Sequence, residues 1–538
     1  MTIPWLTVLW LIPAVSSIAV MLLPARRTVS AKQVAIGAAL LTLVWSIVVA
    51  TQFDIGDGKF QLVEDVSWIP AFGARYSLAL DGIGLALILL TVVLTPILLL
   101  AGWRDADSTA DDAGSPRRVH TYLALMLAVE AMVLMSFVAI DVLLFYIFFE
   151  AMLVPMYFLI GGFGSATEQA RSRAALKFLL YNLFGGLIMM ASVIGLYVVS
   201  AQSNLGNDGG GTFSFTALQA AARTGGLDAS STTMNIIFLG FVFAFAVKAP
   251  LWPLHTWLPD AAVSTTPAAA VMMMAVMDKV GTFAMLRFCI GLFPEASETF
   301  APVISTLAVI SIVYGAICAV GQRDVMRLIA YSSISHFGFI VLGIFALTSQ
   351  GQSGSTLYMV NHGLSTAALF LIAGFLVTQR GTALIADYGG VQKLAPILAG
   401  TFLVAGMATL SLPGLAPFVS EFLVIIGTFT RYPVAAIIAT SALVLSAMYI
   451  LWTYQRMMGG PVRKSATVDT GSDTQIVDLN LRQKAVVAPL IVGLLVLGIF
   501  PQLALNYINP AVDHSHQPPA VERSVTIGPA DSSVEGPR

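Results

Sequence analysis

The sequence has 538 residues, of which 57% are hydrophobic and 10% charged, and its mean hydropathy is +0.85. A soluble domain carries about 25% charged residues, so this composition excludes an ordinary soluble enzyme. The net charge of -2 leaves no basic surface for nucleic acid, and two cysteines are too few for a zinc or iron-sulfur site, which needs about four ligands.

Apolar runs of about 20 residues match the length of a helix that crosses a hydrocarbon layer about 30 Å thick. Bounding these runs by charged and turn residues predicts fourteen spans. We therefore expect an all-α integral membrane protein with about fourteen transmembrane helices, the seventh and twelfth of which are interrupted. The expected spans are 5–23, 33–52, 79–102, 118–139, 140–162, 171–200, 231–253, 260–291, 301–320, 325–348, 355–378, 395–430, 432–458 and 483–507.

The first run lacks the basic start of a signal peptide, because Arg26 and Arg27 follow it. We expect it to be retained as a span whose start lies outside. With this orientation eighteen of the 27 Lys and Arg residues fall in inner loops and seven in outer loops, as the positive-inside rule requires. Both termini are therefore predicted outside. The longest hydrophilic loop, 201–230, is rich in glycine and too short for a catalytic domain.

Lys248 lies inside the seventh span, in "FLGFVFAFAVKAPLWPLHTWLPDA", about 21 Å deep at the rise of a helix. Pro250 and Pro253 follow it and break the helix beside the charge. Broken helices at mid-membrane are a common construction of ion sites in transporters. Charged residues in spans are rare and usually face a protein interior or a water path. The structural alternative is a lysine that reaches the inner interface.

Glu150 lies near the middle of its span, in "AIDVLLFYIFFEAMLVPMYFLIGG". A carboxylate within about 4 to 6 Å of Lys248 would hold the ammonium in its charged form, and separating the two would release the proton. At an effective dielectric of 20, a pair about 5 Å apart is worth roughly 3 kcal/mol. The pair can thus load and unload a proton, or it is a static ion pair that joins two helices.

Lys279 lies in the middle of the eighth span with Asp278 beside it, in "VMMMAVMDKVGTFAMLRF". Neighbours on a helix point about 100° apart, so the two side chains serve different faces. We interpret Lys279 as a relay lysine. Asp278 is either a partner for another helix or a tolerated buried charge.

His336 and His362 occupy the tenth and eleventh spans and are flanked by Ser and Thr hydroxyls. Histidine titrates near pH 6.5, which suits a proton shuttle. A single membrane histidine is as often a packing residue, but two on successive helices after Lys279 favour a relay.

Glu421 follows a second break, at Pro413 to Pro417, and so mirrors Lys248 with the charge after the break. An inverted repeat of five helices predicts this symmetry. The expected segments are an N-terminal three-helix segment 1–117, a first repeat 118–291, a second, inverted repeat 301–458, a last helix 483–507 and a polar tail 508–538. Glu130 and Asp141 border spans and are weaker candidates.

Five motifs together carry a resemblance over almost the whole chain: "FYIFFEAMLVPMYFLIGGFG", "FAVKAPLWPLHTWLPDA", "GQRDVMRLIAYSSISHFGF", "NHGLSTAALFLIAG" and "LPGLAPFVSEF". They resemble the proton-translocating, antiporter-like membrane subunits of NADH-quinone oxidoreductase. The resemblance implies a Glu150–Lys248 pair, a central relay of Lys279 and His336, and an exit side of His362 and Glu421. Combining it with the helix order predicts the path Glu150, Lys248, Lys279, His336, His362, Glu421.

Within that family the sequence is most similar to the M branch, also called the subunit 4 type. The chain ends in a short polar tail, and Glu421 stands where the sister branches resemble each other in carrying Lys. The sequence departs from the family after "LPDA", where Ala262 and Ser264 replace the common His and Glu. Water or His255 would have to take over any role in proton uptake.

The resemblance further implies that flavin, iron-sulfur clusters and quinone belong to partner subunits and that this chain holds no cofactor or metal. The partners it implies are lipid, protons and other membrane-arm subunits, including sister antiporter-like chains. It implies the plasma (inner) membrane of a bacterium. Three alternatives remain. The first is a subunit of a multisubunit Na+/H+ antiporter or membrane-bound hydrogenase, and the second is a structural scaffold. The third, a self-contained transporter, is disfavoured because no span offers a polar pocket for an organic substrate.

Overall fold

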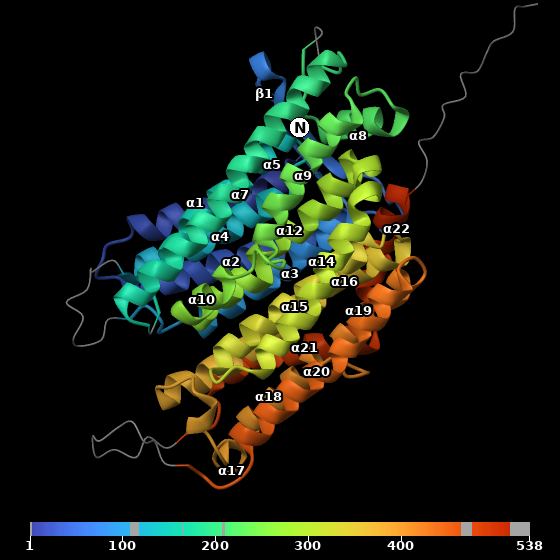
Figure 1. Ribbon diagram of the computed structural model, residues 1–538. Helices are drawn as coiled ribbons and strands as arrows, with labels where there is room; N and C mark the ends of the chain where they lie inside the picture. Colours follow the sequence, from blue (N-terminus) through green and yellow to red (C-terminus); the bar gives the residue numbers. More distant parts are fainter. Residues whose placement is uncertain (1–2, 108–117, 165, 207–209, 464–475, 517–538) are drawn as a thin grey trace, which may run out of the picture.

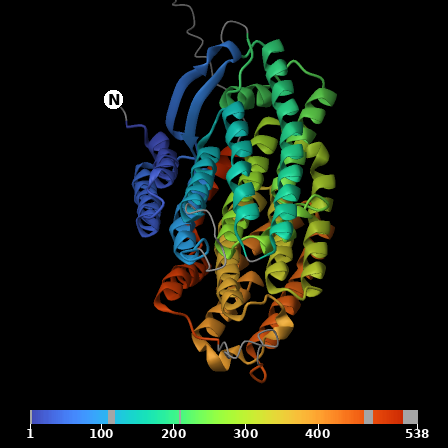
Figure 2. The ribbon, with the colours of Figure 1, turned by 90° about the vertical axis from the view of Figure 1, so that its left-hand side faces the viewer.

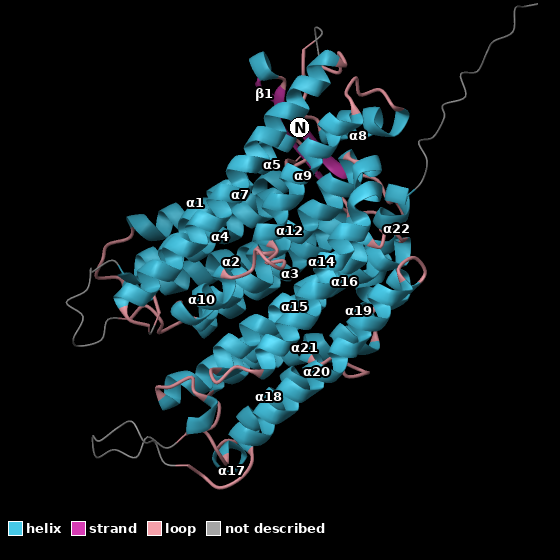
Figure 3. Ribbon diagram, in the orientation of Figure 1, coloured by secondary structure: helices cyan, strands magenta, loops and turns pink. Residues whose placement is uncertain are grey.

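In the computed structural model, which describes residues 3–107, 118–164, 166–206, 210–463 and 476–516, the chain is a bundle of long helices (Figures 1 and 3). Thirteen helical segments among the described residues are long and apolar enough to cross a membrane. They are α1 (Trp5–Leu22), α2 (Thr28–Gln52), α3 (Gly82–Ala101), α4 (Arg118–Val138), α5 and α6 (Val142–Ala151 and Leu153–Gly162), α7 (Glu168–Gln202), α9 (Ser231–Lys248), the run α11 to α13 (Pro267–Leu292), α14 (Pro294–Val320), α15 (Val325–Phe345), α16 (Ser349–Arg380), α20 (Pro433–Met458) and α21 (Leu481–Ile499).

The twelfth expected span, 395–430, consists of two shorter apolar helices, α18 (Pro396–Thr409) and α19 (Ala416–Phe429). Turns at 410–415 separate them, with Ser411 and Gly414 at positive φ. The other predicted break is also present, because α9 ends at Lys248 and α10 (Trp257–Ser264) begins after eight non-helical residues. Both charges therefore lie beside an interruption of helical backbone.

The two sides of the break after α9 are joined by a hydrogen bond from Trp257, the first residue of α10. The indole Nε1 of Trp257 donates a hydrogen bond of 3.0 Å to the carbonyl oxygen of Val247. A buried carbonyl at a helix end needs such a partner. The interruption is thus a satisfied part of the structure.

The expected eighth span, 260–291, is wrong as a single helix. Its first residues belong to α10, and the membrane-crossing run begins anew at Pro267 after Thr266 caps it. Within this run two π-helical stretches, η3 (Met272–Met277) and η4 (Met285–Cys289), enclose the short helix α12 (Lys279–Ala284). Single π turns inside helices often mark functional sites.

Burial divides the helices into a centre and a rim. The run α11 to α13 is buried along its whole apolar window, and α15 and α16 are buried along 94% of theirs. By contrast, α1, α2, α20 and α21 bury a third of their windows or less. A helix apolar on all sides belongs in an interior or against lipid, so the predicted relay residues of α12, α15 and α16 lie in the protein's interior.

The all-α expectation misses one hairpin, β1 (Gln61–Ile69) paired antiparallel with β2 (Ala74–Leu80). The expected third span started at 79, inside β2. Figure 2 shows the hairpin at one end of the bundle, near α8 (Phe215–Thr224), another element that the sequence did not predict. We call this end the hairpin face.

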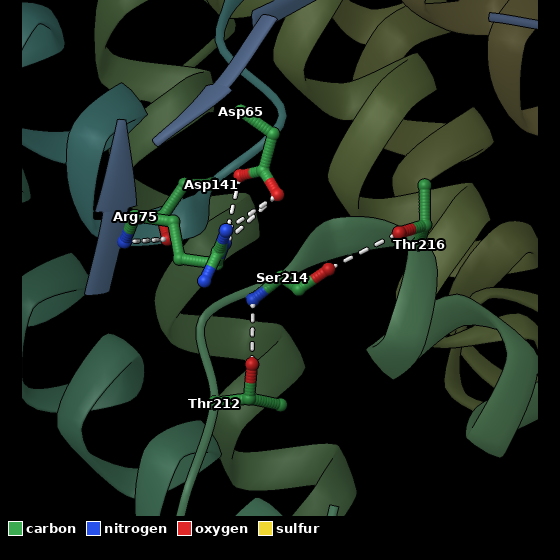
Figure 4. Close-up of polar contacts among 6 residues, drawn as sticks. All are labelled: Asp65, Arg75, Asp141, Thr212, Ser214 and Thr216. Carbon is green, nitrogen blue, oxygen red and sulfur yellow. Dashed lines mark hydrogen bonds and ion pairs between the residues drawn. The ribbon is translucent and has the colours of Figure 1, made fainter. Parts of the chain in front are cut away.

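Polar contacts fasten the hairpin to the bundle (Figure 4). Asp65 pairs with the Arg75 guanidinium across the two strands at 2.7 Å, and the backbone N–H of Arg75 donates to Asp141 Oδ2 at 3.0 Å. Asp141 also caps α5 by accepting from the N–H of Leu144 at 2.9 Å. One carboxylate therefore joins the hairpin to the helix that carries Glu150.

The end of the chain corrects two boundaries. The expected last span, 483–507, stops at Ile499, and α22 (Gln502–His516) follows and packs against α3 and α16. Residues 508–516 of the expected polar tail are therefore helical, while 517–538 lie outside the described residues, as do 1–2 and 108–117 of the expected segment 1–117. The remaining short helices are η1 (Pro70–Phe72), η5 (Ile385–Asp387) and α17 (Val391–Leu394).

Candidate functional site

Lys248, the last residue of α9, is 1% exposed. Its ammonium Nζ donates to the carbonyl oxygen of Phe149 at 2.9 Å and lies 4.3 Å from the centroid of the Phe149 ring. A desolvated ammonium is stabilised by both contacts. The lysine is thus held by the residue that precedes Glu150 in α5.

The Glu150 carboxylate lies against Gly186 of α7, where a Cβ would collide with it. Its Oε1 atom is buried without a hydrogen-bond partner among the described residues, and its charge acts on Lys248. The structure therefore brings the two predicted residues together electrostatically, while the lysine's direct partner is a backbone carbonyl.

A close helix crossing connects this pair to the next lysine. At Gly281 of α12 a Cβ would lie 3.0 Å from the N atom of Ala249 and 3.1 Å from Cβ of Lys248. The helix start at Asp278 and Lys279 is less than one turn away along α12. The glycine permits the approach of the two elements.

Asp278 is fully buried, and neither carboxylate oxygen has a hydrogen-bond partner among the described residues. Its charge acts on both Lys248 and Lys279. A buried group without a partner is costly, which is typical of a functional position. Of the two interpretations open for Asp278, its charge interaction with Lys248 of α9 is in line with a partner for another helix.

Lys279 is 1% exposed and contacts His362 of α16, with 2.5 Å between its Nζ and Nδ1 of the imidazole. The same ammonium lies 4.1 Å from the ring centroid of Phe337. His362 Nε2 in turn lies 3.1 Å from the Thr366 hydroxyl. The lysine and the imidazole are thus in direct contact in the most buried part of the bundle.

The two histidines are neighbours, but in the reverse of the expected order. Their ring centroids are 5.4 Å apart, and His362 rather than His336 contacts Lys279. The prediction followed chain order, whereas the packing of α12 against α16 decides which imidazole lies nearer. His336 Nδ1 is 2.6 Å from the hydroxyl of Tyr358, and its Nε2 has no partner among the described residues.

Tyr358 is the functional candidate that the sequence did not reveal. Its hydroxyl contacts His336 and interacts with the Glu421 carboxylate of α19, which also accepts a hydrogen bond from Ser411 in the α18–α19 break. Tyr358 precedes His362 by four residues, so one face of α16 carries both. That spacing was the available signal.

The other secondary candidates stay apart from these contacts. Glu130 of α4 is fully buried, without a hydrogen-bond partner for either oxygen among the described residues. His255, in the break after α9, has its ring centroid 5.0 Å from that of Tyr314. Close to it, Asp260 pairs with Lys177 at 2.8 Å and with Arg327.

We call the connected residues the polar row. From one end to the other they are Glu150, Lys248, Asp278, Lys279, His362, His336, Tyr358 and Glu421. Within the described residues no group of three or more His, Cys, Asp and Glu could hold a metal ion. The row consists of groups that can gain and lose protons, and they lie in a buried interior where each charge acts strongly on the next. Such an arrangement can pass a proton from group to group.

A family model described as "NADH:quinone oxidoreductase/Mrp antiporter, TM" matches residues 139–446. The chain is 57% identical to NADH-quinone oxidoreductase subunit M of Mycobacterium tuberculosis, with 99% of each chain covered. It is 36% identical to subunit M of Rhodobacter capsulatus over 90% of each, and 33% identical to NADH-ubiquinone oxidoreductase chain 4 of Marchantia polymorpha over 94% of this chain and 95% of the relative.

Among solved structures, a chain of respiratory complex I from Thermus thermophilus with bound NADH is 28% identical, with a TM-score of 0.79 over 95% of this chain and 99% of that one. A chain of the Mrp complex from Dietzia has a TM-score of 0.83 at 22% identity, over 96% and 98%. The second likeness concerns the fold.

Proposed function

The chain belongs to the NADH:quinone oxidoreductase/Mrp antiporter family of membrane subunits, and on that premise we propose that it is the M-type proton-translocating subunit of an NADH-quinone oxidoreductase. The observation that carries this proposal is the contact between Lys279 and His362 at 2.5 Å in the fully buried centre. A lysine and an imidazole in direct contact exchange a proton rather than share two charges.

In the proposed path a proton on Lys248 moves by way of Asp278 to Lys279, then to His362 and His336, and from there through the Tyr358 hydroxyl to Glu421. Glu150 sets the charge of Lys248 from the start of the row. Lys248 alternates between Glu150 and the Phe149 carbonyl, and the position at the carbonyl supports a lysine that has moved away from its counter-charge.

The redox chemistry is proposed to lie in partner subunits, which carry the flavin, iron-sulfur clusters and quinone and include the sister antiporter-like chains. We place the complex in the plasma (inner) membrane of a bacterium, with both termini outside. The alternative, a subunit of a Na+/H+ antiporter or membrane-bound hydrogenase, is not favoured, because the relatives with the greatest identity reported above are named as oxidoreductase subunits.

The inverted repeat also belongs to the proposal. The two breaks, after Lys248 in the first half and before Glu421 in the second, support two copies of a five-helix unit over 118–291 and 301–458. In each copy the charged residue at the break, Lys248 or Glu421, lies at one end of the part of the proton path that the copy contains.

The test is Lys248→Ala in the assembled complex. We expect NADH-driven proton translocation to be lost and quinone reduction to slow, because the row then lacks its first carrier, while the complex still assembles. Lys393→Ala, at an exposed lysine of α17, serves as the matched control and should leave both activities unchanged. Normal proton translocation in the assembled Lys248→Ala complex would leave only a scaffold role.

A further inference from the structure

We propose that Thr366 of α16 is a positioning residue that selects the tautomer of His362, so that the lone pair of Nδ1 faces Lys279 and can take a proton from it. The inference rests on the proposed function and deepens it, because it assigns the atom of the imidazole that receives the proton. It starts from an unusual hydrogen bond of the Thr366 side chain.

The three threonines of α16 differ in what their hydroxyls contact. Thr356 and Thr378 each donate to the backbone carbonyl four residues back, at 2.9 and 2.8 Å, which is the ordinary bond of a threonine inside a helix. The Thr366 hydroxyl instead lies 3.1 Å from Nε2 of His362, the side chain of the residue four positions back. This hydroxyl is therefore directed at a member of the polar row.

The surroundings of Thr366 keep its hydroxyl on the imidazole. The backbone carbonyl four residues back belongs to His362, and it already accepts a hydrogen bond of 3.3 Å from the Ser365 hydroxyl. Thr366 is 3% exposed and His362 1%. A buried hydroxyl requires a hydrogen-bond partner, so the pairing of Thr366 with Nε2 is a built part of the helix.

The other ring nitrogen determines which atom carries the hydrogen. Nδ1 of His362 lies 2.5 Å from Nζ of Lys279. An ammonium has donors and no acceptor, so Nδ1 must offer it a lone pair, and the hydrogen of the neutral imidazole then lies on Nε2. Nε2–H donates to the Thr366 hydroxyl oxygen, which has lone pairs to accept it. With the hydrogen on Nδ1, that hydrogen and those of the ammonium would point at each other.

The proton transfer leaves the bond to Thr366 in place. One N–H bond of the Lys279 ammonium breaks and one forms at Nδ1 of His362. The lysine becomes a neutral amine, and the ring becomes an imidazolium with a hydrogen on each nitrogen. Because the Thr366 hydroxyl accepts from Nε2–H before and after the transfer, it stabilises both the tautomer that receives the proton and the product of the step.

A residue that only fills space would respond differently to substitution. Thr366→Val keeps the shape of the side chain and removes the hydroxyl, whereas Thr366→Ser keeps the hydroxyl and removes a methyl group. A packing role predicts that the serine variant is impaired more, and the tautomer role predicts the reverse order. The matched control is Thr356→Val, which alters a fully buried threonine of the same helix whose hydroxyl donates to the backbone.

The experiment uses the complete complex in proteoliposomes with NADH supplied outside, and the initial rate of proton translocation is measured for each assembled variant. We expect Thr366→Val to lower the rate by about tenfold, because Nε2–H then lacks its acceptor in a buried site. Thr366→Ser should restore most of the wild-type rate, and Thr356→Val should leave it unchanged. The solvent deuterium isotope effect on the rate should increase in Thr366→Val alone, because the slowed proton transfer then limits turnover.

A wild-type rate in Thr366→Val, a greater loss in Thr366→Ser, or equal losses in Thr366→Val and Thr356→Val would each overturn the tautomer role. If Thr366→Val does not assemble, Thr366→Ala is compared with Thr366→Ser, from which it differs by the hydroxyl alone, and equal rates of these two would refute the role. Lys279→Ala in the same assay separates the two proposals. If it pumps normally, the polar row fails; if it is inactive while Thr366→Val pumps normally, only the tautomer role fails.

Discussion

Phe149 gives Lys248 two partners, a carbonyl oxygen at 2.9 Å and an aromatic face at 4.3 Å. The neighbouring Glu150 instead lies on the bare backbone of Gly186. The ammonium is therefore stabilised away from its counter-charge, so little free energy is needed to move it between the two. A proton carrier needs that balance, because a tight ion pair would hold the proton in place.

Gly186→Ala tests this arrangement. The new Cβ would occupy the place of the Glu150 carboxylate, so we expect the carboxylate to be displaced and proton translocation to fall by about tenfold, or roughly 1.4 kcal/mol in barrier. Gly195→Ala is the control on the same helix, where a Cβ meets only the flexible side chain of Ile237 at 3.3 Å. Equal activity of the two variants in vesicle assays of proton uptake would contradict the role assigned to Gly186.

Charged residues of the row could be predicted because their cost in a span makes each one conspicuous. Lys248, Lys279 and Glu421 were found in this way. Phe149, Gly186 and Tyr358 were not, because an aromatic residue or glycine in an apolar run is ordinary and acquires its role only through tertiary contacts. The order of the two histidines was missed for the same reason.

Helices and their breaks follow from local chemistry, since apolar length sets a span and proline ends it. The two π-helical stretches carry no such signal, because Met272–Met277 has the composition of an ordinary helix. The hairpin was also missed. Strand β1 is half exposed along most of its length and lacks the alternation that identifies a strand.

Asp141 joins the hairpin to the bundle by accepting hydrogen bonds from the backbone N–H groups of Arg75 and Leu144. Asp141→Ala should therefore destabilise both the hairpin and the start of α5. The loss of a cap costs about 1 kcal/mol, and an unpaired N–H of Arg75 adds about as much. We expect a lower thermal unfolding midpoint of the purified complex, measured by loss of the assembled species on heating. Asp141→Asn keeps an acceptor oxygen, so its unfolding midpoint should fall less. An unchanged midpoint for Asp141→Ala would show that the hairpin is held by other contacts.

At the scale of the whole molecule, burial falls from the run Pro267–Leu292 at the centre to α1, α2, α20 and α21 at the rim. The rim residues are apolar and exposed, as lipid or neighbouring membrane subunits require. The hairpin and α17 lie at opposite ends of the bundle (Figure 1), so each marks one side of the membrane.

The predicted orientation can be tested with single cysteines at exposed positions of these two ends, in a Cys318→Ser background that leaves only the buried Cys289. Asp57→Cys, beside the hairpin, should react with a membrane-impermeant maleimide in intact cells. Lys393→Cys, in α17, should react only in inverted vesicles. The reverse pattern would contradict the proposal that both termini lie outside.

The two π-helical stretches make the number of residues in one span part of its chemistry. A regular α-helix turns by about 100° per residue, and a π-helical stretch turns by less because its hydrogen bonds join residues five apart, so η3 sets the direction in which Lys279 leaves the backbone. Deleting one methionine from Met272–Met274 would leave composition, hydropathy and span length almost unchanged. It would nevertheless turn the lysine away from His362 and towards another neighbour. In this span, the rotational register of the helix matters as much as which residues are present.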